Sequence, residues 1–195
     1  MERKTKLERK TRETNISVEV NLDGKGNYNI DTPIGFLNHM LELFSKHSLI
    51  DLNIKAEGDI HVDYHHLVED LAIVMGKAIN EALGKKEKIE RYGFFILPMD
   101  ESLVEVVVDL SGRPYLVYNV KVSREKIGDF DTELFKEFFI AFTHNIKANI
   151  HINLKYGENT HHIFEAVFKG LAKALRMAIT INPNIEGINS TKGIL

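Results

Sequence analysis

The sequence predicts an α+β protein made of two similar halves, each a sheet with helices on one face. Stretches that alternate apolar and polar residues, as half-buried strands do, are interleaved with stretches of helical periodicity. The same order of patterns returns in the second half of the chain. Each predicted helix carries one apolar stripe that needs a partner, so we expect the two helix layers to pack against each other.

Two segments of the chain are near copies of two others. Residues 13–24 read ETNISVEVNLDG and residues 101–112 read ESLVEVVVDLSG, so Glu13 corresponds to Glu101. Later, YHHLVE at 64–69 returns as THHIFE at 160–165. Chance similarity in one strand is common, but a strand and a His-His pair in the same order predict an internal duplication. The second half is longer, and we place its extra residues in the polar stretch 123–132.

The first elements follow from local patterns. Apolar residues at every second position predict a half-buried strand at 16–22, and Asp-Gly-Lys-Gly at 23–26 predicts a turn. A second strand is expected from 28–30. Pro33 suits the first turn of a helix, and the apolar residues that follow at helical spacing continue to Phe44.

The rest of the first half is a strand at 50–56 and a longer helix at 64–83, which ends at Gly84. This half therefore has the order strand-strand-helix-strand-helix, and the second half repeats it after an additional opening strand. Its strands are expected near 94–98, 103–110, 115–122 and 148–155, and its helices near 132–145 and 161–179. The halves thus comprise residues 1–86 and 87–180, followed by an extended tail at 181–195.

The composition is that of a globular protein, with 44% hydrophobic and 27% charged residues, which excludes an intrinsically disordered chain. A formal net charge of -3 gives no global attraction to nucleic acid or to an anionic membrane. No apolar run approaches the roughly 20 residues that cross a bilayer, and no signal core follows the charged N-terminus, so we expect a cytoplasmic protein. The absence of cysteine excludes disulfides, thiolate metal sites and cysteine nucleophiles.

Two His-His-x-x-Glu motifs on helices predict metal binding. On a helix His65 and Glu69 share a face whereas His65 and His66 diverge, so adjacent histidines serve two ions rather than one. One such motif alone is more often structural, but two in register favour metal. Imidazole and carboxylate ligands without sulfur fit Mn, Fe or Zn, with Mn or Fe preferred in octahedral sites. The candidate ligands are His39, His65, His66, Glu69, His161, His162 and Glu165. The histidines without a duplicated partner are expected to be structural or solvated: His61, His144 and His151.

A second group of residues predicts a site for a phosphate-sized anion. Arg91 lies at the start of a strand, Arg113 lies in a Ser-Gly-Arg-Pro turn, and Lys169 follows the second metal motif by one helical turn. The tail contains Ser-Thr-Lys-Gly at 190–193, a stretch with little structural reason to be ordered without a ligand. Arginine gives bidentate contacts and lysine a point charge, so together they can hold a phosphate.

The chain resembles the imidazoleglycerol-phosphate dehydratases, lyases of histidine biosynthesis. The segments that carry the resemblance are RETNISVEVNLDG, FLNHMLELFSKH, GDIHVDYHHLVEDLAIVMGKA, RYGFFILPMDE, VVVDLSGRPYL, HHIFEAVFKGLAKALR and STKG. It implies dehydration of imidazoleglycerol phosphate to imidazole-acetol phosphate. It also implies two bound Mn²⁺ ions per subunit and a cage-like homo-oligomer of twenty-four subunits with active sites at subunit contacts.

The resemblance also assigns roles to individual residues. It implies that the first ion is held by His39, His66, His161 and Glu165. It implies that the second is held by His65, Glu69, His162 and Glu137, the last standing where the family often has histidine. Glu13 matches the family's acid/base glutamate. The substrate contacts that it implies are Glu13, His47, Arg91, Arg113, Lys169, Ser190 and Lys192.

The implied reaction explains why a base and metals are needed together. The carbon proton that is lost is not next to a carbonyl, so a metal-stabilised imidazolate would expel the ring-adjacent hydroxyl. The diazafulvene-like intermediate would then lose a carbon proton to Glu13. Two alternatives stay open, a dinuclear metal phosphohydrolase and a metal-stabilised storage cage. The lack of Asp-rich metal motifs counts against the first, and the many strands count against the second.

Overall fold

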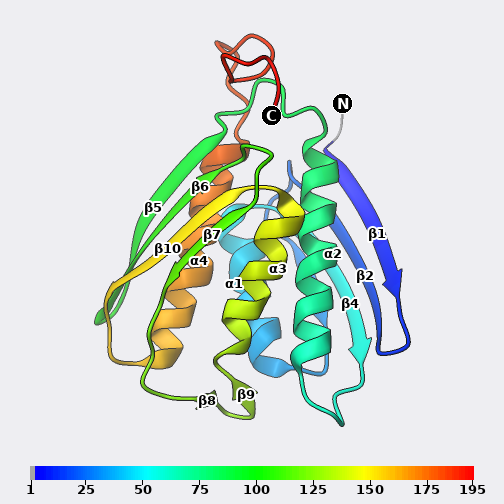
Figure 1. Cartoon of the computed structure of the whole chain (residues 1–195), viewed down its shortest axis with the longest axis vertical. Helices are drawn as coiled ribbons and strands as arrows, with labels where there is room; N and C mark the ends of the chain where they lie inside the picture. Colours follow the sequence, from blue (N-terminus) through cyan, green and yellow to red (C-terminus); the bar gives the residue numbers. More distant parts are fainter. Residues whose placement is uncertain (1–2) are drawn as a thin grey trace.

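The computed structural model describes residues 3–195, and within this range four helices lie between two four-stranded sheets (Figure 1). The first half comprises β1 (Lys4–Lys10), β2 (Thr14–Asn21), β3 (Tyr28–Asp31), α1 (Gly35–Ser48), β4 (Asp51–Gly58) and α2 (His65–Leu83). The second half comprises β5 (Tyr92–Met99), β6 (Ser102–Asp109), β7 (Tyr115–Asn119), β8 (Lys126–Ile127), β9 (Phe130–Asp131), α3 (Leu134–Ile146), β10 (Asn149–Tyr156) and α4 (Thr160–Ile179).

The two sheets have the same topology. Their strand orders are β1-β2-β4-β3 and β5-β6-β10-β7, and in each sheet the last pair is parallel while the other pairs are antiparallel. The same exception at the same place in both sheets is what a duplicated unit requires. The predicted α+β fold of two similar halves is therefore confirmed.

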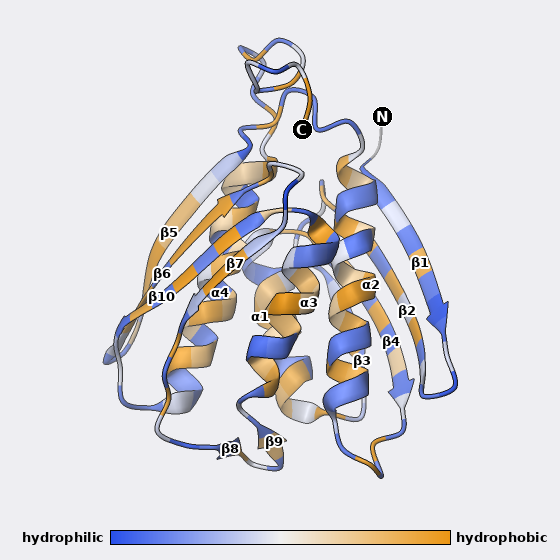
Figure 2. Ribbon diagram, in the orientation of Figure 1, coloured by the Kyte–Doolittle hydropathy of each residue, from blue (hydrophilic) through white to orange (hydrophobic). Residues whose placement is uncertain are grey.

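The prediction that only the second half opens with an additional strand is wrong, because β1 opens the first half in the same way. In β1 every second residue is exposed, and Leu7 alone supplies an apolar side chain against the core. Figure 2 shows β1 as mostly hydrophilic beside the more apolar β2. An edge strand rich in lysine and arginine resists pairing with other chains, and the same charges hide its period in the sequence.

The extra residues of the second half include a short hairpin, β8–β9, that the sequence pattern did not predict. It exists because Phe130 is fully buried and packs against Phe135, with 4.7 Å between the ring centroids. This contact joins the hairpin to the first turn of α3.

One apolar core joins both halves, as the packing of helix layer on helix layer requires. Helix α2 packs against α3, and α1 packs against α4. The α2–α3 approach is close: a Cβ atom on Gly76 would lie 2.8 Å from the carbonyl oxygen of Phe142, so only glycine fits. No helix within residues 3–195 is long and apolar enough to span a membrane.

Helices α2 and α4 begin at the same end of the molecule, where the β8–β9 hairpin lies (Figure 1). Both His-His pairs therefore lie at this end. The tail after α4 lies at the opposite end, where Ile188 and Ile181 form isolated bridges with Glu87 and Ile89. The fold thus separates the predicted metal ligands from the predicted anion-binding tail.

Candidate functional site

Three predicted metal ligands converge between α1 and α4. The Nε2 atoms of His39 and His161 lie 2.9 and 3.1 Å from the same carboxylate oxygen, Oε1 of Glu165. His161 and Glu165 share a helix face at a spacing of four residues, and the packing of α1 on α4 brings His39 to them. One possible ligand atom of each residue lies within 4.8 Å of the others, so the group can hold a single ion.

The Glu165 carboxylate is buried but remains charged. Burial alone would raise the pKa of Glu165, but hydrogen bonds from Lys169 and His39 outweigh this and lower the pKa to about 2. The Lys169 ammonium donates to Oε2 at 2.6 Å. At neutral pH the group therefore combines two imidazoles with an anionic oxygen, a donor set without sulfur that fits Mn²⁺ or another divalent transition metal.

The second histidine of each pair contacts a different carboxylate. Nδ1 of His66 lies 3.0 Å from Oδ2 of Asp59, and Nδ1 of His162 lies 2.8 Å from Oε2 of Glu101. These hydrogen bonds raise the pKa of both histidines. His66, the fourth predicted ligand of the first ion, therefore lies with Asp59 on the α2 side and does not join the group at Glu165.

The predicted second ion would draw on the equivalent pair, α2 with α3. Glu69 is exposed on α2, and Glu137 is half-buried in the first turn of α3. Within the described range, the His39 group is the only set of three such side chains close enough to share an ion.

The predicted anion-binding residues fall into two places. Lys169 lies beside Glu165, and half-buried His47 lies near it, with the pKa of His47 lowered by burial and by the charges of Lys173 and Lys169. Arg91 lies at the far end of the molecule, where its guanidinium bonds to Asp109 at 2.7 Å and to the Asn189 carbonyl at 2.9 Å.

A pocket of about 560 Å³ lies at this far end, between Arg91 and tail residues that include Ser190. The Ser190 hydroxyl accepts a hydrogen bond from the backbone N–H of Lys192, whose side chain is exposed. Arg113 is exposed in the turn after β6, and a Cβ atom on the neighbouring Gly112 would meet the terminal Leu195. The tail therefore brings Ser190 near Arg91.

The two places are too far apart for one small ligand. The N–H of Arg91 donates to the carbonyl of Ala178, near the end of α4, while His161 lies in its first turn. An α-helix rises about 1.5 Å per residue, so about 25 Å separates these levels of α4. A single chain therefore does not bring the His161 group and Arg91 within reach of the same small molecule.

Sequence reasoning missed the contacts of Asp59 and Glu101 with the histidines. The available signals were the alignment of Glu101 with Glu13 and the position of Asp59 shortly before the first His-His pair.

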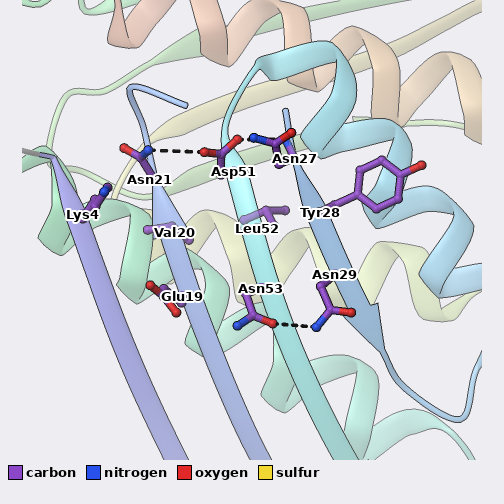
Figure 3. A pocket seen from close by; sticks show the side chains of 10 residues that line it. All are labelled: Lys4, Glu19, Val20, Asn21, Asn27, Tyr28, Asn29, Asp51, Leu52 and Asn53. Carbon is purple, nitrogen blue, oxygen red and sulfur yellow. Dashed lines mark hydrogen bonds between the residues drawn. The ribbon is translucent and has the colours of Figure 1, made fainter. Parts of the chain in front are cut away.

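Another pocket, of about 380 Å³, lies on the first sheet and includes Asp51 (Figure 3). The Asp51 carboxylate accepts hydrogen bonds from the backbone N–H groups of Lys25 and Asn27, so Asp51 has a structural role.

Comparison with known proteins identifies the family. Residues 32–175 match a family model described as imidazoleglycerol-phosphate dehydratase. Proteins of that name from Clostridium novyi (strain NT) and Geobacter metallireducens are 55% and 52% identical, covering 99% and 100% of this chain and 98% and 100% of their own.

Two solved structures also match. A crystal structure of imidazoleglycerol-phosphate dehydratase from Staphylococcus aureus superposes with a TM-score of 0.84 at 44% identity, covering 92% of this chain and 99% of its own. A crystal structure of the enzyme from Pyrococcus furiosus gives 0.84 at 40% identity, with 97% and 100% covered.

Proposed function

We propose how the residues of this chain act in catalysis, on the premise that the chain belongs to the imidazoleglycerol-phosphate dehydratase family, hydro-lyases of histidine biosynthesis. The observation that carries the proposal is the convergence of His39, His161 and Glu165 on one point. Their donor set suits Mn²⁺, and we propose two such ions per subunit. When bound, the metal would supply Lewis-acid stabilisation of negative charge on the imidazole of the substrate.

The ligand sets are those that the family resemblance implies. His39, His161 and Glu165 would hold the first ion together with a His66, and Glu69 and Glu137 would hold the second together with His65 and a His162. Because His66 lies with Asp59, we propose that a neighbouring subunit completes the first set. The packing of α2 on α3, equivalent to that of α4 on α1, supports the second set.

Glu13 would move the carbon proton. Its side chain is exposed just before β2, and within residues 3–195 no hydrogen bond or ion pair engages its carboxylate. Its backbone carbonyl accepts the N–H of Asp59, which places Glu13 next to the residue that contacts His66. A carboxylate that is free of hydrogen bonds can accept a proton, and a well-placed base contributes about 10²–10⁴-fold to rate.

The phosphate would be held by the basic residues and the tail, and this requires assembly. We propose that Arg91, Arg113, Ser190 and Lys192 of one subunit meet the metal ligands, Lys169 and His47 of another. Binding the phosphate away from the reacting carbons would orient the substrate. Within one chain, Arg91 and the metal ligands lie about 25 Å apart along α4, which exceeds the reach of a small phosphate ester. Contact between subunits would bring the two sets together.

The outer face of the second sheet offers a surface for that assembly. Tyr92, Phe94 and Ile96 on edge strand β5 are 53%, 62% and 53% exposed, and Val107 lies beside Phe94 on β6. Exposed apolar patches of this kind mark protein–protein contacts. We propose a large homo-oligomer, of twenty-four subunits as the resemblance implies, and a cytoplasmic location as expected of a biosynthetic enzyme.

The test is to incubate the purified protein with imidazoleglycerol phosphate, with Mn²⁺ and after chelation. Formation of a ketone phosphate only with Mn²⁺ is the expected result. Release of inorganic phosphate would instead favour a phosphohydrolase. Equal ketone formation after complete chelation would refute the metal's role.

A further inference from the structure

We propose that Glu101 is a positioning residue, which fixes the ring of His162 in the form that binds metal, whereas its duplicated counterpart Glu13 stays unengaged for proton transfer. This inference rests on the metal site proposed above. It concerns the two carboxylates that the duplication placed at equivalent positions, before β2 and before β6.

Both oxygens of the Glu101 carboxylate are engaged. Oε1 accepts the backbone N–H of Asn159, at the start of α4, at 2.8 Å, and the hydroxyl of Ser102 at 2.9 Å. Oε2 accepts from Nδ1 of His162 at 2.8 Å. The carboxylate is therefore tied to the helix that carries the histidine and cannot turn away from the ring.

This contact determines which ring nitrogen of His162 is available. An ionised carboxylate only accepts hydrogen bonds, so the proton of the neutral ring must lie on Nδ1. Nε2 then keeps its lone pair, the form that binds metal. Nε2 of His162 lies 3.8 Å from Oδ2 of Asp100.

In the first half, a different carboxylate orients the equivalent histidine, His66. Nδ1 of His66 lies 3.0 and 3.3 Å from the two oxygens of Asp59, which follows Gly58 at the end of β4. Glu13, the counterpart of Glu101, makes no such contact within residues 3–195.

The equivalent glycines show where the counterpart of Asp59 lies. A Cβ atom on Gly58 would lie 3.2 Å from Leu67, and one on Gly157 would lie 2.9 Å from Ile163, the residue that follows the second His-His pair as Leu67 follows the first. Glu158 therefore corresponds to Asp59, yet it is exposed and makes no ion pair with His162. Each half has two carboxylates near its histidine pair. In the first half Asp59 bonds to the histidine, whereas in the second half it is Glu101, the counterpart of Glu13, that does so. This exchange leaves the Glu13 carboxylate without a hydrogen bond within residues 3–195.

The substitution Glu101→Gln tests the role without changing side-chain size. The N–H of Asn159 needs an oxygen, so the amide oxygen takes the place of Oε1 and the amide NH₂ faces Nδ1 of His162. Nδ1 must then accept, which moves the ring proton to Nε2 and blocks metal binding there. The contacts that hold the start of α4 remain.

The experiment measures Mn²⁺ binding to the assembled protein, from the electron paramagnetic resonance signal of the unbound ion, for wild type, Glu101→Gln and the control Glu158→Gln. We expect two tight ions per chain in wild type and in the control. In Glu101→Gln one ion should bind about 10- to 100-fold more weakly while the other is unchanged. The melting temperature of the chelated protein should stay the same.

Two tight ions in Glu101→Gln would overturn this role and leave the metal proposal standing. Equal weakening of both ions with a lower melting temperature would assign Glu101 a purely structural role and also overturn it. Absence of tight Mn²⁺ binding in wild type would instead refute the metal proposal itself, and with it this inference.

Discussion

The substitution Glu165→Gln should destabilise the chelated protein in a pH-dependent way. Glu165 has its pKa lowered from 4.5 to about 2. One pKa unit corresponds to about 1.4 kcal/mol, so the charged carboxylate contributes up to about 3 kcal/mol to folding at neutral pH. For a chain of this length, that amounts to about 6–12 °C in melting temperature.

The sign follows from the direction of the pKa shift. A lowered folded-state pKa stabilises the fold above the unfolded value, near 4.5, and this stability is lost as the pH falls toward 2. At pH 7 the melting temperature of wild type should therefore be higher than that of Glu165→Gln, and this difference should disappear between about pH 4.5 and 2. Thermal unfolding at fixed protein concentration, in chelator, measures it. Glu69→Gln, the exposed counterpart on α2, is the matched control and should change little. A gap of the same size at every pH would refute the reasoning.

Three further substitutions test the catalytic base, the tail and the assembly surface. Glu13→Gln should keep both ions and the assembly but lose about 10²–10⁴-fold in turnover, since only the base is removed; normal kcat with full metal content would exclude Glu13. Lys192→Ala should raise KM for the phosphate substrate more than it changes kcat, and steady-state kinetics showing an unchanged KM would remove the tail from the site. Phe94→Glu places a charge on the outer face of β5 and should reduce the particle size seen by light scattering. Retention of the wild-type size would mean that this face is not part of an interface.

The strands that the sequence predicted are those with one buried and one exposed face. In β2, Ile16, Val18 and Val20 are at most 1% exposed. Because alternate residues of such a strand are buried, its sequence alternates between apolar and polar residues. β1 pairs with β2 along its whole length through backbone hydrogen bonds. Those bonds demand no particular side chains, so a charged edge strand leaves little trace in a hydrophobic pattern.

The candidate metal group could be predicted where helix spacing determines geometry. His161 and Glu165 are neighbours on any helix, so their contact follows from the sequence alone. The approach of His39 depends on how α1 packs against α4, which spacing cannot give. The contacts of Asp59 and Glu101 are still harder to predict from the sequence, because each joins the end or start of a strand to a helix.

The length of α4 connects the fold to the proposed assembly. Its first turn carries His161 and Glu165, and its last turn supports Arg91 and the start of the tail. The helix spans about 30 Å and is packed along its length against β5, β6 and α1, so bending cannot bring its two ends together. A chain that kept every predicted residue but could not associate would therefore hold the candidate metal group and the candidate anion pocket too far apart to meet on one substrate. In this reading, Phe94→Glu should lose dehydration in proportion to lost assembly, although Phe94 itself lies on the outer face of the sheet, away from the metal ligands.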